Sequence, residues 1–438
     1  MTRAKTLTVL FIIIVLGGGF FLFTRTNHQI TIGDKITEVV ETVKEAVVEK
    51  PEEPIDPDAD IAKQKPLANP PKVIKAIYAT AWSASSEKKM AHLMDLLTTT
   101  ELNAIVIDIK DYTGIISYEP DVPLVKEIGA FERRIPKINA LIKRLHDNDI
   151  YVVARISTFQ DSKLPAARPE LAATSKSTGT PWKDRNGLLW ADTASRAVWD
   201  YNISIARDAL DRGFDEINFD YIRWPSDGAI SDLTWPAYDG VTPKDDVVAQ
   251  FFRYLRKQLP GAVISADLFG EVTYVRGPTG VGQNLSKSLG SFDVIAPMTY
   301  PSHYHPNFRG MDNSAKQPYE VLRYSMSQAL DQLAEYTTAR YENSRKLLSS
   351  NADATASSTP FVPTTETIIE ATGGTTFRPW LQDFDMGATY TADMVRAQIR
   401  GVEDASFSDP NLRAEVFQNG WMLWDPSNNY TREALLTE

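Results

Sequence analysis

"GFDEINFDYIRWPSDG", residues 213–228, is the stretch that decides how the rest of the chain is interpreted. Its first half alternates apolar and polar residues, and the apolar ones are the Phe and Ile that strands favour. Its second half gathers four polar or aromatic residues just before a proline, which cannot continue a central strand: Asp220, Tyr221, Arg223 and Trp224. The stretch therefore predicts a buried strand whose end carries functional side chains.

Seven other short apolar runs have the same character, and most are separated by segments with the 3.6-residue periodicity of amphipathic helices. Strands that alternate with helices predict a parallel sheet built from βα units. Eight such strands favour a (β/α)8 TIM barrel over an open doubly wound sheet, and no glycine-rich nucleotide fingerprint follows the first strand. The seven runs cover residues 73–80, 102–110, 150–158, 262–269, 292–300, 377–384 and 420–425.

The N-terminus begins with two basic residues and then a mainly apolar run, residues 7–23, before Arg25. A helix of roughly 17–25 such residues can cross a bilayer. The run ends in "FFLF", which is a poor site for signal peptidase. We therefore expect an uncleaved transmembrane anchor in residues 1–26, with the rest of the chain outside the cytoplasm, at a cell surface or in a periplasm. The alternative is a cleaved signal and a secreted protein.

Three further segments follow the anchor. Residues 27–71 combine a short helical pattern with a stretch rich in proline and acidic residues, which predicts a stalk or linker. Residues 72–438 hold all eight predicted strands and form the TIM-barrel domain. Within that domain, residues 342–376 are dominated by Ser, Thr and Ala, which predicts a flexible insertion.

Composition excludes several kinds of function. The formal net charge is −11 and the sequence has no run of Lys or Arg, so nucleic acid is not an expected partner. The chain has no cysteine, which excludes disulfides, thiolate metal sites and a cysteine nucleophile. Its 9 Trp, 17 Tyr and 18 Phe suit a carbohydrate cleft, but they suit a large core equally well.

In a TIM barrel, the active site lies at the C-terminal ends of the strands. The predicted strands end in carboxylates, arginines and tryptophans, a set that is typical of a sugar-cleaving site. We predict Asp220, Glu271 and Asp267 as catalytic residues. The predicted substrate-binding residues are Trp82, Asp108, Lys110, Arg155, Tyr221, Arg223, Trp224, Tyr300, Gln382 and Trp424.

Glycoside hydrolysis needs two carboxyl groups, one to protonate the leaving oxygen and one to attack or to activate water. Asp220 is the predicted nucleophile or electrostatic stabiliser, Glu271 the general acid/base, and Asp267 the rival for that second role. Carboxyl groups about 5–5.5 Å apart would retain the anomeric configuration and groups roughly 6.5–9.5 Å apart would invert it. Each residue also has a structural alternative: Asp220 could simply pair with Arg155, and Glu271 could be an exposed loop carboxylate.

The substrate-binding predictions carry similar alternatives. Asp108 and Lys110 alternate along a strand, so they should share one face and either contact substrate or form an internal ion pair. A flat tryptophan suits a pyranose ring, yet any single tryptophan is as readily part of the core. His303 and His305 have no evident third ligand, so no metal site is predicted. No cofactor is predicted either, because two carboxyl groups suffice for proton and sugar transfer.

Four motifs in order resemble the family of "putative glycosyl hydrolase" domains of bacterial cell-surface proteins: "GFDEINFDYIRWP", "VISADLFGEVT", "DVIAPMTYPSHY" and "GWMLWDPSNNY". The resemblance covers about residues 72–430 and implies a barrel related to α-amylase-like glycosidases. In those barrels a nucleophilic Asp ends the fourth strand and an acid Glu ends the fifth, positions that fall on Asp220 and Glu271. Chitinase-type barrels are also similar, but Ile222 occupies the place of their catalytic Glu, which argues against that chemistry.

The sequence therefore predicts a membrane-anchored glycoside hydrolase that acts on an extracytoplasmic polysaccharide or oligosaccharide. Two alternatives remain: a barrel that binds carbohydrate without cleaving it, and a cell-surface scaffold. Neither the sugar nor the oligomeric state follows from the sequence.

Overall fold

The computed structural model describes residues 59–350 and 360–437. The predicted anchor and most of the predicted stalk lie outside these residues. Within the described ranges, no helix combines the length and the apolar character needed to cross a membrane.

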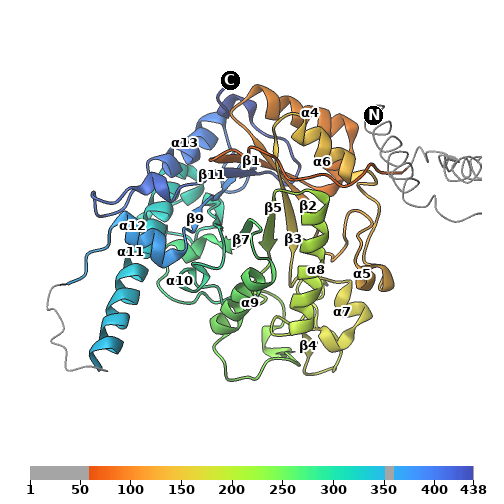
Figure 1. Ribbon diagram of the computed structural model, residues 1–438, viewed down its shortest axis with the longest axis horizontal. Helices are drawn as coiled ribbons and strands as arrows, with labels where there is room; N and C mark the ends of the chain where they lie inside the picture. Colours follow the sequence, from red (N-terminus) through yellow and green to blue (C-terminus); the bar gives the residue numbers. More distant parts are fainter. Residues whose placement is uncertain (1–58, 351–359, 438) are drawn as a thin grey trace, which may run out of the picture. The chain divides into compact units, whose positions relative to one another are not determined.

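Eight parallel strands close into a barrel, as the alternation of the sequence predicts (Figure 1). The last strand pairs with the first, Ile74 opposite Gly420, and the seventh pairs with both the sixth and the eighth. The barrel strands are β1 (Ile74–Ala79), β2 (Ala104–Lys110), β3 (Tyr151–Ser157), β5 (Glu216–Asp220), β7 (Ile264–Phe269), β8 (Val294–Met298), β10 (Trp380–Gln382) and β11 (Gly420–Trp424). Two-residue strands complete the set: β9 (Thr376–Phe377) extends the sheet beside β8, while β4 (Thr174–Ser175) and β6 (Leu233–Thr234) pair outside it.

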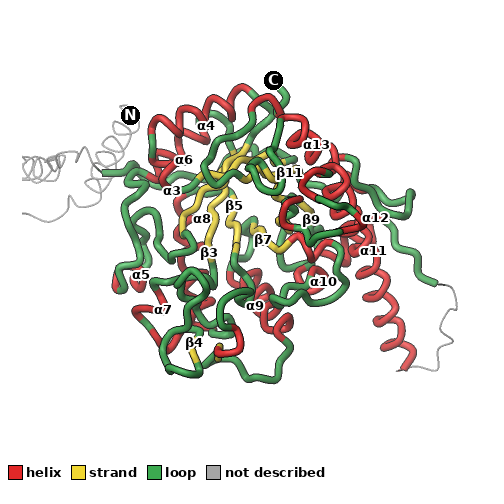
Figure 2. Tube along the Cα trace, turned by 180° about the vertical axis from the view of Figure 1, so that it is seen from behind, coloured by secondary structure: helices red, strands yellow, loops and turns green. Residues whose placement is uncertain are grey.

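Helices surround these strands (Figure 2). The longer ones coincide with the segments of helical periodicity: α4 (Glu87–Thr99), α6 (Ile138–His146), α8 (Arg196–Arg212), α9 (Lys244–Gln258), α11 (Pro318–Ser350) and α13 (Ala392–Glu403). One- or two-turn helices lie in the connections: α3 (Ala81–Ser85), α5 (Pro123–Glu127), α7 (Leu164–Ala167), α10 (Leu285–Ser288) and α12 (Thr365–Thr372). The predicted TIM barrel is thereby confirmed.

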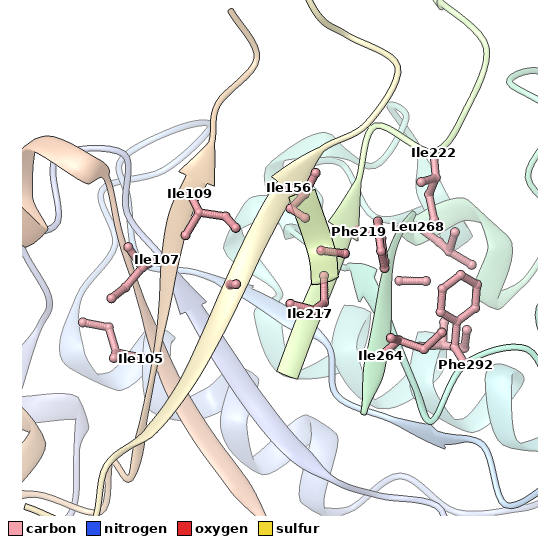
Figure 3. Close-up of a cluster of buried hydrophobic side chains, with 14 of the residues drawn as sticks. Ile105, Ile107, Ile109, Ile156, Ile217, Phe219, Ile222, Ile264, Leu268 and Phe292 are labelled. Atoms are coloured by element: carbon pink, nitrogen blue, oxygen red, sulfur yellow. The ribbon is translucent and has the colours of Figure 1, made fainter. Parts of the chain in front are cut away.

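The main hydrophobic core lies between the strands and the helices. Side chains alternate across a strand, so every second residue faces outward. Ile105, Ile107 and Ile109 of β2 and Ile217 and Phe219 of β5 occupy these outward positions and are completely buried (Figure 3). Each such side chain stabilises the fold by about 1.5–3 kcal/mol relative to an exposed one.

The intervening residues face the lumen of the barrel. Small and aromatic side chains fill its middle, among them Ala76, Val106, Tyr151, Val153, Ala296, Trp380 and Met422. Charged groups flank this filling along β5. Glu216, at the start of the strand, forms an ion pair with Arg378, and Asp220 ends the strand at the opposite mouth. The lumen is therefore a packed core with one charged layer near its base and another at its mouth.

The predicted flexible insertion is wrong at both of its described ends. Helix α11 continues through its first residues to Ser350, and α12 forms in its second half. A capping box between Thr364 and Thr367 starts α12, and Ile368 buries the apolar side of that helix. The ring of Tyr341 stacks on Phe361 with 3.8 Å between centroids. The Ser/Thr-rich composition predicted flexibility, but one of its threonines caps α12 and Ile368 of that helix is buried.

The last part of the predicted stalk packs against the base of the barrel instead of standing away from it. The Asp60 carboxylate accepts the backbone N–H groups of Asn139 and Ala140 in the first turn of α6. The backbone N–H of Gln64 donates to Arg212, and a side chain at Gly213 (φ 101°) would collide with Gln64. The barrel domain therefore begins at about residue 60.

Candidate active site

Four charged residues from four neighbouring strands face one another at the C-terminal end of the lumen: Asp108, Arg155, Asp220 and Asp267. We call them the carboxylate cluster. The strand register brings them together, because Asp108 lies opposite Arg155 and Ser157 lies opposite Asp220. All four are buried, so their charges act on one another through protein rather than water.

Arg155 joins the three aspartates. Its Nη1 binds Asp108, its Nη2 binds Asp220, and its Nε lies 3.6 Å from the Oδ2 of Asp267. The guanidinium also lies over the ring of Trp424, 5.0 Å from its centroid. Burial opposes the charge on Arg155, but the carboxylates of Asp108 and Asp220 outweigh it and raise the pKa of the guanidinium. The arginine is a fixed cation that orients the carboxylates around it.

Asp267 is held as a neutral acid beneath the mouth. Its side chain is 1% exposed, and its Oδ1 accepts hydrogen bonds from Asn218 Nδ2 (2.8 Å) and Trp380 Nε1 (2.7 Å). Burial, with the charge of Asp220 as the second cause, raises the pKa of Asp267 to about 8. A carboxyl group with that pKa carries a proton at neutral pH, and that proton reduces the repulsion inside the cluster.

Asp108 has a second partner besides the arginine. The hydroxyl of Tyr78 donates to its Oδ2, and the ring of Tyr78 stacks on Trp424 with 3.9 Å between centroids. Burial raises the pKa of Asp108 even though Arg155 opposes the shift. Asp108 and Trp424 are therefore at the mouth, where substrate binding was predicted, and Tyr78 joins them although it was not among the predicted residues. Its inward position on the first strand, two residues past Ala76, was the available signal.

The backbone is strained directly after Asp220. Tyr221 has a φ of 52°, a left-handed conformation that is unfavourable for a bulky side chain by about 1–2 kcal/mol. Its backbone N–H donates to the Oδ1 of Asp220. Both oxygens of Asp220 are thus fixed, one by this N–H and one by Arg155. Strain of this kind concentrates where a functional side chain must be aimed.

Glu271 lies beside this cluster on the wall of a 440 Å³ cavity. It follows β7 in a short 3₁₀ turn, and its side chain is exposed. A side chain at Gly270 would come within 2.6 Å of the carbonyl oxygen of Met298, so glycine is required for the approach that places Glu271 here. The cavity is lined by Phe269, Gly270, Glu271, Tyr274, Met298, Tyr300, His303, Tyr304 and His305.

Tyr300 connects the cavity with the carboxylate cluster. Its ring belongs both to the lumen packing and to the cavity wall. Burial, followed by the charges of Asp267 and Asp220, raises the pKa of its hydroxyl. The cavity and the cluster are therefore parts of one mouth.

The prediction that Lys110 contacts substrate is wrong. A β-bulge interrupts the register between Asp108 and Lys110, so the two residues do not share a face. The Lys110 side chain is 0% exposed; its Nζ forms a 2.8 Å ion pair with Asp161 and a 3.1 Å hydrogen bond with the Oδ1 of Asn202 in α8. Lys110 is a structural cation between the barrel and a helix.

Gln382 and Trp224 also have structural roles. The amide of Gln382 is fully buried and donates to the carbonyl oxygens of Phe384 and Met386, which leaves none of it for a sugar. Trp224 is packed edge-on against Trp235, and its Nε1 donates to the carbonyl oxygen of Lys244, the first residue of α9. Both predictions of substrate contact are wrong, because contacts within the protein account for these buried side chains.

Trp82 remains a candidate. It lies on α3 directly after β1, is 63% exposed, and has the guanidinium of Arg134 at 4.9 Å from its ring centroid. A free indole face beside a barrel mouth can stack on a sugar ring.

The comparisons identify a family. A family model described as "Putative glycosyl hydrolase domain" matches residues 76–349 and 357–430. No curated protein matches the sequence.

Solved structures show weaker likenesses. A hypothetical protein from Ruminiclostridium thermocellum is 40% identical over 44% of this chain and 96% of its own, with a TM-score of 0.41. Amy13B from Eubacterium rectale is 11% identical over 83% of this chain and 67% of its own (TM-score 0.42). The α-galactosidase TtGalA from Thermus thermophilus is 15% identical over 61% of this chain and 50% of its own (TM-score 0.38). These likenesses carry no inference about the reaction.

Proposed function

The chain belongs to the family described as "Putative glycosyl hydrolase domain", and we propose that it cleaves glycosidic bonds of an extracytoplasmic polysaccharide with Asp220 and Glu271 as its carboxyl pair. The family makes it a glycosidase. The observation that carries the finer proposal is the geometry of Asp220: a strand end, a strained following residue and Arg155 together aim one carboxylate at a mouth that also holds Glu271.

Asp220 acts on the anomeric carbon. The transition state of glycoside hydrolysis carries positive charge on the sugar ring, and a fixed carboxylate stabilises that charge or attacks the carbon directly. Arg155 and the N–H of Tyr221 hold the carboxylate in place before the sugar arrives. No reorganisation of this group is then needed during the reaction.

Glu271 exchanges the proton with the glycosidic oxygen. A proton donor must come within hydrogen-bond reach of the leaving oxygen, and Glu271 lines an open cavity. Asp267 already holds a proton at neutral pH, yet it is buried and hydrogen-bonded to Asn218 and Trp380. Asp267 therefore keeps the net charge of the cluster low, while Glu271 is the residue that can meet substrate.

The test uses the full chain with a panel of bacterial and plant polysaccharides and analysis of the products. Asp220→Asn should abolish product release, because it removes the charge but keeps the shape of the side chain. Glu271→Gln should lose activity on natural glycans but keep much of it on nitrophenyl glycosides, whose leaving group needs no protonation. If Glu271→Gln kept full activity, while Asp267→Asn lost activity on natural glycans but kept it on nitrophenyl glycosides, the general acid would be Asp267.

A carbohydrate-binding barrel without turnover is the second candidate. One observation favours it: both oxygens of Asp220 already have partners within the protein. In that case the wild-type protein and Asp220→Asn would bind the same glycan equally, and neither would release product.

The proposed location rests on the apolar run in residues 7–23. We propose that this run anchors the protein in a membrane with the barrel outside the cytoplasm. Fractionation of cells that express the full chain, with and without residues 1–26, tests this: the full chain should be in the membrane fraction, accessible to protease added from outside.

A further inference from the structure

Arg223 differs from the other buried cations of the barrel. Arg155 has two bound carboxylates, Arg378 has Glu216, and Lys110 has Asp161. Arg223 is only 9% exposed, yet none of the described residues offers it a carboxylate within 4.0 Å.

The hydrogen bonds of Arg223 satisfy only one edge of its guanidinium. Its Nη1 donates to the carbonyl oxygen of Trp224 (3.0 Å) and lies 3.4 Å from the hydroxyl of Ser226. A guanidinium has five N–H donors, and no protein partner for its other nitrogens is found in the part of the chain that the structure describes. Neither of these nitrogens is both buried from solvent and without a partner, so this edge of the guanidinium is open to solvent.

Three aromatic rings surround the guanidinium. Its central carbon lies 4.7 Å from the ring centroid of Phe269, 5.1 Å from that of Trp190 and 5.2 Å from that of Tyr221. Burial lowers the pKa of Arg223, which means that the charged form of this guanidinium is less stable here than in water. The carboxylates of Asp220, Asp227 and Asp184 oppose this shift, but none of them is in ion-pair contact with Arg223. A buried cation with no carboxylate in contact is unfavourable for folding, which calls for an explanation outside folding.

The position of Arg223 supplies that explanation. It follows Asp220 by three residues, and Phe269 beneath it also lines the 440 Å³ cavity that contains Glu271. A sugar ring bound between Asp220 and Glu271 would therefore lie within reach of the unpaired guanidinium.

A neighbouring cavity of 310 Å³ shows the same preference for cations. It begins at Trp224 and its walls include Lys176 and Lys244 but no acidic residue. On a protein with a formal net charge of −11, two lysines and no acidic residue around a cavity that begins one residue after Arg223 favour an acidic ligand at this part of the surface.

We propose that Arg223 binds an oxyanion on the substrate, the carboxylate of a uronic acid or a sulfate ester, and that the enzyme acts on an acidic polysaccharide. This inference rests on the proposed function, because that function places a sugar in this mouth. The planar guanidinium fork pairs with an oxyanion through two parallel hydrogen bonds, and the dry aromatic surroundings strengthen both. The bound oxyanion supplies the counter-ion that the fold leaves out.

The test measures binding, so that it does not depend on turnover. Isothermal titration calorimetry on the full chain compares oligosaccharides of galacturonate, glucuronate and mannuronate with their methyl esters, which keep the ring but lose the charge. A parallel arm compares sulfated with desulfated galactan oligosaccharides. We expect at least one acidic ligand to bind about tenfold or more tightly than its neutral counterpart, and added salt to reduce the difference. The arm that shows the preference identifies the oxyanion.

Arg223→Met should remove that preference without weakening the binding of neutral ligands, and Arg223→Lys should keep only part of it. Arg196→Met is the matched control, because Arg196 also stacks on two rings, Trp199 and Tyr254, but is exposed to solvent on α8 and lines neither cavity. Removal of an unpaired charge should leave the melting temperature of Arg223→Met unchanged or higher.

The inference is overturned if no acidic ligand in either arm binds more tightly than its neutral counterpart, or if Arg223→Met keeps the preference. It is also overturned if Arg223→Met lowers the melting temperature while Arg223→Lys binds every ligand as the wild type does, since a structural role would then explain the residue. A charge preference without product release would overturn the proposed glycosidase activity and leave only the binding of an oxyanion by Arg223 supported. Cleavage of neutral glycans without any preference for acidic ligands would support the glycosidase and overturn this inference.

Discussion

The two charged layers of the lumen both combine arginine with acidic residues, but they differ in the number of acidic residues for each arginine. Near the base, Glu216 and Arg378 form a one-to-one pair, each 1% exposed, and the hydroxyl of Tyr151 lies 3.3 Å from the glutamate. At the mouth, Arg155 faces three aspartates. The balanced pair can do nothing but hold strands together. The excess of aspartates over arginine at the mouth disfavours folding, but a hydrolase needs carboxyl groups that are not fully neutralised. The ratio of acidic to basic groups therefore distinguishes the structural layer from the catalytic one.

The largest expected effect is on activity at the mouth. Asp220→Asn should lower kcat by about 10⁴-fold or more, as loss of a catalytic group does in other hydrolases. Steady-state hydrolysis on the polysaccharide found in the panel measures this, and a melting curve should show a stability close to that of the wild type. A variant that unfolds but hydrolyses normally when stabilised by ligand would assign Asp220 to the scaffold.

At the base, the effect should fall on stability alone. Arg378→Met leaves Glu216 buried without a counter-ion, so it should lower the free energy of unfolding by about 3–5 kcal/mol, with kcat unchanged at temperatures where the variant is folded. Denaturant titration provides the value. Arg133→Met, which removes an exposed ion pair with Glu119, is the control and should change stability little. A loss of kcat in Arg378→Met would show that the two layers are coupled.

The mouth should also make stability depend on pH. Burial raises the pKa of Asp267 from its ordinary value near 3.8 to about 8, so between these values the folded state binds one proton more than the unfolded state. Stability should therefore fall as pH rises from about 5 to 8, by up to about 1.4 kcal/mol per pH unit from this group. Denaturant titrations of the wild type and Asp267→Asn measure this, and the variant should show a flatter profile. Equal slopes would mean that Asp267 is ionised throughout this range in the folded protein.

The smallest expected effect is at the rim. Trp82→Ala should raise KM about three- to tenfold with kcat unchanged, because a stacking contact of about 0.5–1.5 kcal/mol helps to hold the sugar. Initial rates at several glycan concentrations measure both constants. Tyr341→Ala removes another exposed aromatic ring, on α11, and should leave KM unaltered. Equal effects of the two variants would indicate that neither ring contacts substrate.

The barrel could be predicted because periodicity is a local property. Apolar and polar residues alternate within "FDEINFDYI" itself, and similar short patterns predicted all eight strands. The pairing of Asp220 with Arg155 was foreseen as an alternative, since both end strands at the same mouth.

Errors arose where a single residue changed the geometry. The bulge before Lys110 turned its side chain toward α8, and alternation alone gave no sign of it. The cap at Thr364 started a helix within a segment whose composition indicated flexibility. The stoichiometry of the two layers depends on Arg378, which precedes β10 and meets Glu216 only in the closed barrel. Contacts of that range are not encoded in any window of sequence.

The strap formed by residues 60–67 closes the side of the barrel domain that lies away from the carboxylate cluster. Its backbone donates hydrogen bonds to Arg212 and to Asp215, which directly precedes β5, and Asp60 accepts two from the first turn of α6. These contacts lie near the start of β5, whereas Asp220 ends the same strand at the mouth. The strap therefore stabilises the floor of the barrel and leaves the mouth uncovered.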